Sequence, residues 1–392
     1  MEGNAGSGSA MAGLTPKSCL NVVIIALNKT CDGKRWYTST KELQLASLEF
    51  CIACRSYLTL HLTIDQNTPR GLLAAADAQP PDPKRLGRTR VPRLRARRVT
   101  WNMPSAWGLS TPIFAMTDVD CLEFGPDFYG NVEAVTWPQR LKRIDFCDSF
   151  RFDEPIDRVE WPAPLQELSF GENFNQPIEH VKFPALLQQL RFCGCSSFDQ
   201  PIAGSCLPSS LRVLDLGVHF DQPVADVVWP ETLEKLRFGH LFNQPIDRTT
   251  FSSSLVQLTF GERFNQPVDN VRWPSSLQDL TFGSELGSAE SGILLISCFN
   301  QRIDSSAWPK SLRRLTLGHE FNQSLQGLGT WMPNLEVFRL LIDGDMEVGS
   351  KSLLRGIEWP TGLRQLAVFE HSNMNKVAIP LTIEVLYIYN GF

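Results

Sequence analysis

Residues 264–283 read FNQPVDNVRWPSSLQDLTFG, and residues 242–261 read FNQPIDRTTFSSSLVQLTFG. The two stretches begin 22 residues apart and agree at their phenylalanine, leucine and glycine positions. Self-similarity at a period of this length indicates a solenoid of stacked coils, because one short coil cannot bury its own apolar face.

Each coil can be numbered from an anchor, an aromatic or aliphatic residue that usually precedes a proline. Apolar residues recur at positions 4, 7 and 9 after the anchor, as Leu277, Leu280 and Phe282 do after Trp273. Positions 7 and 9 lie on one face of a strand and position 8 on the other. A weaker coil with Val119, Leu122 and Phe124 comes first, so about 11–12 coils are predicted in all. The anchors of the eleven clear coils are Trp137, Trp161, Phe183, Leu207, Trp229, Phe251, Trp273, Trp308, Trp331, Trp359 and Ile379.

The pattern predicts a parallel β-sheet on one side of the solenoid, with one strand in each coil. Most coils carry one proline after the anchor and a second in the FNQP segment. Prolines at these intervals argue against helices, so we expect little helix on the convex side. The expected strand centres are Leu168, Leu190, Leu214, Leu236, Leu258, Leu280 and Leu315.

The composite motif of FNQP followed by W-P-x-S-L-x-x-L-x-F-G resembles the FNIP-type leucine-rich repeat. The resemblance covers roughly residues 115–392. It implies a leucine-rich-repeat-like scaffold of mostly undefined partner, in a family whose repeats are sometimes attached to F-box or kinase segments. No kinase motif set is found in this sequence.

Three segments are expected. Residues 1–79 form an N-terminal region of unknown fold, 80–114 a Pro-rich and basic linker, and 115–392 the solenoid. An insert near 284–298 adds 13 residues between Phe282 and Phe299, compared with the interval from Phe260 to Phe264. It is either a functional loop at one edge of the solenoid or the product of an imperfect gene model.

The formal net charge of −5 excludes a generally basic nucleic-acid binder. Eight basic residues nevertheless lie between Lys84 and Arg98. No run of 18 apolar residues predicts a membrane span. The ten cysteines show no regular framework, which favours free thiols in a reducing compartment. We therefore expect a cytoplasmic protein, with a nuclear location as the alternative that the basic stretch suggests.

Several repeated or isolated polar residues could suggest a site. The Asn/Asp and Gln columns of the FNQP segment, and the serines at position 3, recur in coil after coil and are expected to satisfy the backbone of each coil. Cys51-x-x-Cys54 lacks the second ligand pair of a zinc site, and His219, His240 and His319 are expected to be structural. We expect no catalytic residues, no metal and no cofactor.

Function is expected where the coils differ, on the open face of the sheet. Position 8 and its neighbours supply the candidate residues for binding a protein or peptide: Asp145, Arg191, Asp215, Lys235, Arg237, Thr259, Thr281 and Arg339. The hypothesis is therefore a non-enzymatic scaffold. The alternative is a nucleic-acid-associated protein that uses the basic arm 84–98, with the solenoid as a spacer.

Overall fold

The computed structural model describes residues 60–64, 96–102, 104, 106, 119–193, 196–203, 207–286, 294–304, 307–340, 354, 356–369 and 379–389. The chain divides into two compact units, one of residues 1–60 and 80–96 and the other of residues 61–79 and 97–392. The second unit contains the repeats.

One short strand per coil forms the sheet. The strands of the main sheet are β1 (Leu60–Ile64), β2 (Ala96–Trp101), β3 (Cys121–Phe124), β4 (Arg143–Asp145), β5 (Glu167–Phe170), β6 (Gln189–Phe192), β7 (Val213–Asp215), β8 (Lys235–Arg237), β9 (Gln257–Phe260), β10 (Asp279–Phe282), β13 (Arg314–Leu317), β14 (Val337–Leu340), β15 (Gln365–Phe369) and β16 (Val385–Tyr389).

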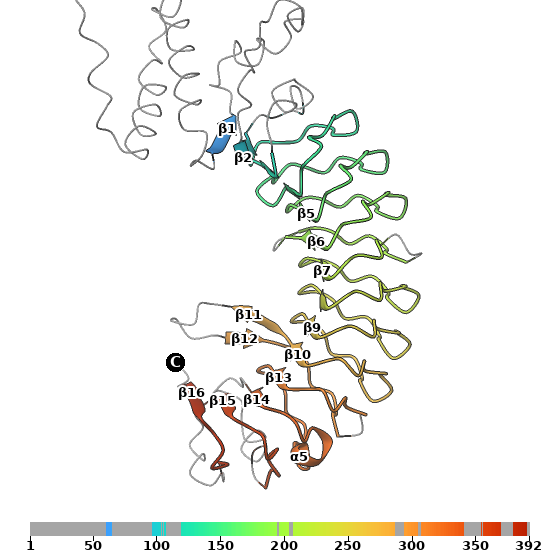
Figure 1. Cartoon of the computed structure of the whole chain (residues 1–392). Helices are drawn as coiled ribbons and strands as arrows, with labels where there is room; N and C mark the ends of the chain where they lie inside the picture. Colours follow the sequence, from blue (N-terminus) through green and yellow to red (C-terminus); the bar gives the residue numbers. More distant parts are fainter. Residues whose placement is uncertain are drawn as a thin grey trace, which may run out of the picture. The chain divides into compact units, whose positions relative to one another are not determined.

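The main sheet has 14 strands among the described residues, and their order in space is their order in the chain. The pairs from β2 to β16 are parallel, and the position-7 residues face one another in register, as Leu258, Leu280 and Leu315 do. Figure 1 shows the strands lining one side of the stacked coils and loops on the opposite side. The predicted repeat solenoid and its strand centres are confirmed.

Two columns of phenylalanine fill the interior. Phe260 and Phe282 come from position 9 of neighbouring coils, and Phe264 and Phe299 begin FNQP-type segments. All four are fully buried. The ring of Phe282 stacks on that of Phe299 at 3.9 Å between centroids, and that of Phe260 on that of Phe264 at 4.1 Å. The ring of Phe260 also stacks on that of Phe282 in the next coil at 5.4 Å between centroids, so each coil contributes to the apolar core of its neighbour.

The Asn/Asp column forms a ladder on the loop side. Oδ1 of Asn265 accepts hydrogen bonds from the backbone N–H of Asn300 at 3.0 Å and from Nε2 of Gln301 at 2.9 Å. The same two bonds link Asp199 to the following coil, and Asp221 likewise. These side chains satisfy backbone groups that have no strand partner. The expectation that this column serves the coil agrees with these contacts.

The serines at position 3 also form hydrogen bonds to the backbone of the preceding coil. Oγ of Ser276 donates to the carbonyl of Leu255, and Oγ of Ser311 to that of Leu277, both at 2.7 Å. At position 10, Gly261 allows two coils to approach closely, because a Cβ there would lie 1.8 Å from the carbonyl oxygen of Gly239.

Within the described ranges the only helix is α5 (Leu328–Trp331), so the expectation of little helix is confirmed. The insert forms an antiparallel pair of strands, β11 (Ser284–Leu286) and β12 (Leu294–Ile296), in a small sheet of its own. The pair extends away from the stacked strands in Figure 1. The expected loop is therefore at least partly a hairpin.

The main sheet includes strands before residue 115, where the solenoid was expected to begin. Strand β2 lies within the expected linker 80–114 and pairs with β3 in parallel. Val99 and Trp101 are buried. The sequence register missed this coil because residues 96–101 follow a run of arginines and no FNQP segment. At the other end, Leu386 keeps the register but is 39% exposed, because β16 is the last strand of the described sheet.

The strand register gives a first prediction. Leu258 is 1% exposed, whereas Thr259 is only half-buried on the open face. We expect Leu258→Ala to lower the free energy of unfolding by about 2–5 kcal/mol, and Thr259→Ala by less than about 0.5 kcal/mol. Denaturant melts of the two variants measure both values. Equal losses would mean that the assigned faces are wrong.

The ladder gives a second prediction. Asn265→Ala removes the acceptor of Asn300 N–H and Gln301 Nε2, and should cost about 1–3 kcal/mol of unfolding free energy. Asn265→Asp keeps Oδ1, as Asp199 and Asp221 do in their coils, and is the matched control. We expect the aspartate variant to melt close to the wild type. A loss as large as that of the alanine variant would show that the shared oxygen is not the stabilising group.

Candidate interaction face

The candidate site is the open face of the sheet. Successive residues of a strand point to opposite faces, so the buried leucine at position 7 leaves positions 6 and 8 on the outside. In β8, Leu236 is buried and Lys235 and Arg237 are exposed. The regular repeat thus presents two columns of side chains whose identity changes from coil to coil.

The register brings the predicted residues into one row. Position 8 runs across neighbouring strands as Asp145, Ser169, Arg191, Asp215, Arg237, Thr259, Thr281, Thr316 and Arg339. Lys235 lies in the adjacent position-6 column, next to Val213. The structure thus places all the candidate residues on one face, although they span most of the solenoid's length.

At the β4 end, charges are paired. Nη2 of Arg143 lies 2.6 Å from Oδ2 of Asp145, and Nη1 of Arg143 lies 3.3 Å from Oε2 of Glu167. The hydrogen bond to Asp145 is the main reason that the pKa of Arg143 is raised. Asp145 is therefore already neutralised by its own strand.

In the middle lies a group that we call the basic patch: Arg191, Lys235 and Arg237 around Asp215. Nη1 of Arg237 lies 3.8 Å from Oδ2 of Asp215, whereas Nη2 of Arg191 donates to Oε1 of Gln189 at 2.7 Å. Burial raises the pKa of Asp215, although the guanidinium of Arg237 and the N–H of Gly217 lower it in part. The expected Arg–Asp–Arg row exists as a strand register, with the closer ion pair on the Arg237 side.

Beyond the patch, Thr259 and Thr281 are half-buried, as is Arg339. Sequence reasoning missed one firm contact here. Nη1 of Arg314 lies 2.7 Å and 2.6 Å from the two carboxylate oxygens of Asp279. The two residues are 35 apart in sequence because the insert separates their coils. The sequence could have indicated this contact, because both residues occupy position 6 of neighbouring coils and carry opposite charges.

Two position-8 residues depart from the expected exposure. Ser169 and Thr316 are each 6% exposed. In the row, Ser169 has Asp145 and Arg191 as neighbours, and Thr316 lies next to Arg339. Exposure at position 8 therefore differs from coil to coil and is not decided by the position alone.

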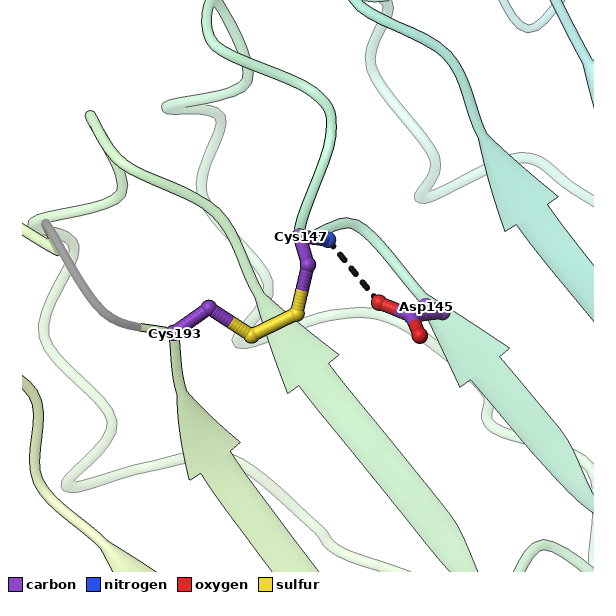
Figure 2. Close-up of side chains that lie close together, drawn as sticks. All are labelled: Asp145, Cys147 and Cys193. Carbon is purple, nitrogen blue, oxygen red and sulfur yellow. Dashed lines mark hydrogen bonds between the residues drawn. A yellow bond between two sulfur atoms is a disulfide. The ribbon is translucent and has the colours of Figure 1, made fainter. Parts of the chain in front are cut away.

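The expectation of free thiols is wrong for two cysteines. Cys147 and Cys193 form a disulfide across a sequence separation of 46 residues, as Figure 2 shows. The backbone N–H of Cys147 donates to Oδ1 of Asp145 at 2.9 Å. Sulfur and carboxylate atoms of these three residues lie within 4.8 Å of one another. Cys51 and Cys54 lie outside the described residues.

The histidines of the turns have backbone and side-chain partners. Nδ1 of His219 lies 2.8 Å from the carbonyl oxygen of Ser196, and Nδ1 of His319 accepts the N–H of Ser297 at 3.0 Å. Nε2 of His240 contacts Oε2 of Glu262. These contacts are consistent with the structural role expected of the three histidines.

Across the described ranges, no helix combines the length and the apolar character that crossing a bilayer requires.

The FNIP repeat family model matches residues 198–240 and 242–285, so the predicted FNIP repeats are confirmed there. The crystal structure of CroV588, described as a novel circular LRR protein, aligns with a TM-score of 0.54 and 26% identity over 76% of this chain and 44% of that chain. A TLR13–ssRNA13 complex aligns with a TM-score of 0.50 and 14% identity over 76% of this chain and 47% of that chain. No curated protein matches the sequence.

These likenesses show a leucine-rich-repeat fold. The chain spans less than half the length of each of the two solved structures. Folds of this kind generally serve as non-enzymatic scaffolds.

The raised pKa of Asp215 gives a third prediction. A carboxyl whose pKa is higher in the folded than in the unfolded state favours folding when protonated and disfavours it when ionised. Asp215→Asn should therefore stabilise the protein above the folded-state pKa, and the Asn side chain can keep the oxygen that accepts Gly217 N–H. The advantage should disappear as the pH falls below the unfolded-state pKa of the aspartate.

Melting temperatures of the wild type and Asp215→Asn, measured from neutral to acid pH, test whether the variant is the more stable of the two at neutral pH. A variant less stable than the wild type at neutral pH would instead show that attraction by Arg237 outweighs the cost of burial.

Proposed function

We propose that the chain is a non-enzymatic scaffold that binds a protein or peptide on the open face of its sheet. One observation carries the proposal. The polar side chains that recur in every coil, such as Asn265 and Ser276, form hydrogen bonds to neighbouring coils. The side chains that vary between coils gather on the face that neighbouring coils leave uncovered. A varied, exposed row on a rigid frame is what recognition of an extended partner requires.

The basic patch is the part of this face best suited to an acidic group. Arg191 and Arg237 flank Asp215 in the row, and Lys235 lies in the adjacent column, which gives the patch a charge of +3 − 1 = +2 on a chain of net charge −5. Arg191 and Arg237 are exposed. Guanidinium groups bind carboxylates through two parallel hydrogen bonds, so either arginine can hold a glutamate, an aspartate or a C-terminal carboxylate of a partner.

A purely structural role for the patch is the competing interpretation. The Arg237 side chain is 59% exposed, and its ion pair with Asp215 has a length of 3.8 Å. Exposed pairs of this kind contribute only about 0–1 kcal/mol. The pair is therefore too weak to be a main source of stability, and both guanidinium groups stay available to a partner.

The alternative function is nucleic-acid binding through the basic arm 84–98. Residues 84–95 lie outside the described residues, and Ala96, Arg97 and Arg98 belong to β2. The guanidinium of Arg98 lies 3.4 Å from the carboxylate of Glu123. One of the solved neighbours is a complex with single-stranded RNA, at an identity that bears on the fold alone. No contact of the described residues favours this alternative over the open face.

A fourth prediction tests the peptide hypothesis. A random displayed peptide library is selected on the full chain, and the recovered peptides are measured against Arg191→Glu combined with Arg237→Glu. We expect acidic peptides to be enriched on the wild type, and their affinity to fall about 30-fold or more in the variant, because two favourable charge contacts become repulsive.

The matched control is Arg248→Glu combined with Arg272→Glu. It makes the same change in net charge at two exposed residues outside the strands, and should bind like the wild type. Normal binding by a folded Arg191/Arg237 variant would exclude the patch. Salt-dependent binding of generic RNA or DNA, abolished when residues 84–98 are deleted, would favour the alternative function.

A further inference from the structure

Position 10 departs from glycine in two coils that lie on either side of a third. Glycine is usual there, but the coils of β4, β5 and β6 carry Cys147, Gly171 and Cys193. Strands two apart in a sheet are separated by roughly 10 Å. The Cα atoms of Cys147 and Cys193 are nevertheless 5.6 Å apart, and the disulfide joins the coils on either side of β5. Figure 2 shows the cross-link at the ends of the strands.

Gly171 makes this approach possible. A Cβ on Gly171 would lie 2.4 Å from the carbonyl oxygen of Phe146 and 2.8 Å from that of Ser149. The segment that follows β4 therefore passes directly over Gly171 toward the next coil. The order cysteine, glycine, cysteine supplies both the two sulfurs and the space that they need.

We propose that Cys147 and Cys193 are a reversible thiol–disulfide modification site whose oxidant is a small disulfide such as oxidised glutathione. One thiolate attacks the oxidant and releases a first molecule of reduced glutathione. The second protein thiolate then attacks the mixed disulfide and releases another. Two protein thiols and one oxidised glutathione thus become one protein disulfide and two reduced glutathiones, with two electrons passing to glutathione.

The position of the pair suits this chemistry. Both cysteines are half-exposed, so a small oxidant can reach them. Only the thiolate of a cysteine attacks a disulfide. Burial raises the pKa of Cys121 to about 11, and it also raises the pKa of Cys298, so both free cysteines of the described residues stay mostly protonated near neutral pH. The pairing of Cys147 with Cys193 rests on the 5.6 Å between their Cα atoms, and it does not depend on the proposed function of the open face.

A metal site built from the reduced pair and Asp145 is less well supported. Oδ2 of Asp145 is paired with Arg143 at 2.6 Å, and its Oδ1 accepts the N–H of Cys147 at 2.9 Å. Both oxygens that would complete the site are therefore engaged. We treat zinc binding as an outcome that the experiment must distinguish.

Peptide mapping tests the site directly. The full chain is reduced, desalted and incubated with mixtures of oxidised and reduced glutathione, then alkylated and digested with trypsin. Cys147 is the only cysteine of its tryptic peptide, residues 144–151, whereas the peptide 192–212 holds Cys193, Cys195 and Cys206. We expect these two peptides to be joined after oxidation and separate after reduction. Cys195→Ser and Cys206→Ser should leave the link unchanged, and Cys193→Ser should abolish it.

Melting provides the second readout. The oxidised wild type should melt about 5 °C above its reduced form, because the cross-link restricts the unfolded chain. Cys147→Ser should show no such difference. A link through Cys195 or Cys206, or no link in the wild type, would overturn the proposal. It would also be overturned if the reduced chain bound one equivalent of Zn²⁺ that Cys147→Ser lost and that blocked oxidation.

Discussion

Stacking of phenylalanine rings between coils is the interaction on which the rest of this structure depends. Each buried ring, such as Phe282, contacts rings of its own coil and of its neighbours, so no coil has a complete core alone. Burial of such a side chain removes a large apolar area from water. Paired strands lie roughly 4.8 Å apart, and rings of neighbouring coils stack at a similar interval, as Phe260 and Phe282 do at 5.4 Å between centroids. The strand pairs, the ring stack and the Asn/Asp ladder therefore repeat together from coil to coil.

The periodicity of the sequence correctly predicted the structural features that recur in every coil. The strand centres, the buried position 7 and the shortage of helix all follow from apolar residues and prolines at fixed intervals, as around Leu280 and Pro274. The missed features depend on contacts that a single coil does not encode. β2 joins the sheet with no FNQP segment to mark it, Ser169 is buried although it occupies position 8, and Cys147 meets Cys193 only because a glycine stands between them.

The difference between features encoded within one coil and contacts between coils also explains why the open face could be located from the sequence but its contacts could not. Position within the coil decides which side chains point outward, and this needs only the strand alternation. Pairing depends on side-chain length and on the next coil. Arg314 donates to both carboxylate oxygens of Asp279, whereas Arg191 donates to Gln189 of its own strand and Arg237 contacts Asp215. Charges at the β4 and β13 regions are thereby matched, and the unmatched positive charge remains at β6 and β8.

The two proposals concern neighbouring parts of one surface. Asp145 and Arg191 each stand two residues before a cysteine of the disulfide, so the cross-link holds the ends of the strands that carry them. Arg191 is also one member of the basic patch. A cross-link between the coils of β4 and β6 limits how far Arg191 can move toward or away from Asp215, whereas Arg237 on β8 lies outside the linked coils. Oxidation would therefore act on one side of the patch, through the position of β6, and leave the ion pair of Arg237 with Asp215 in place.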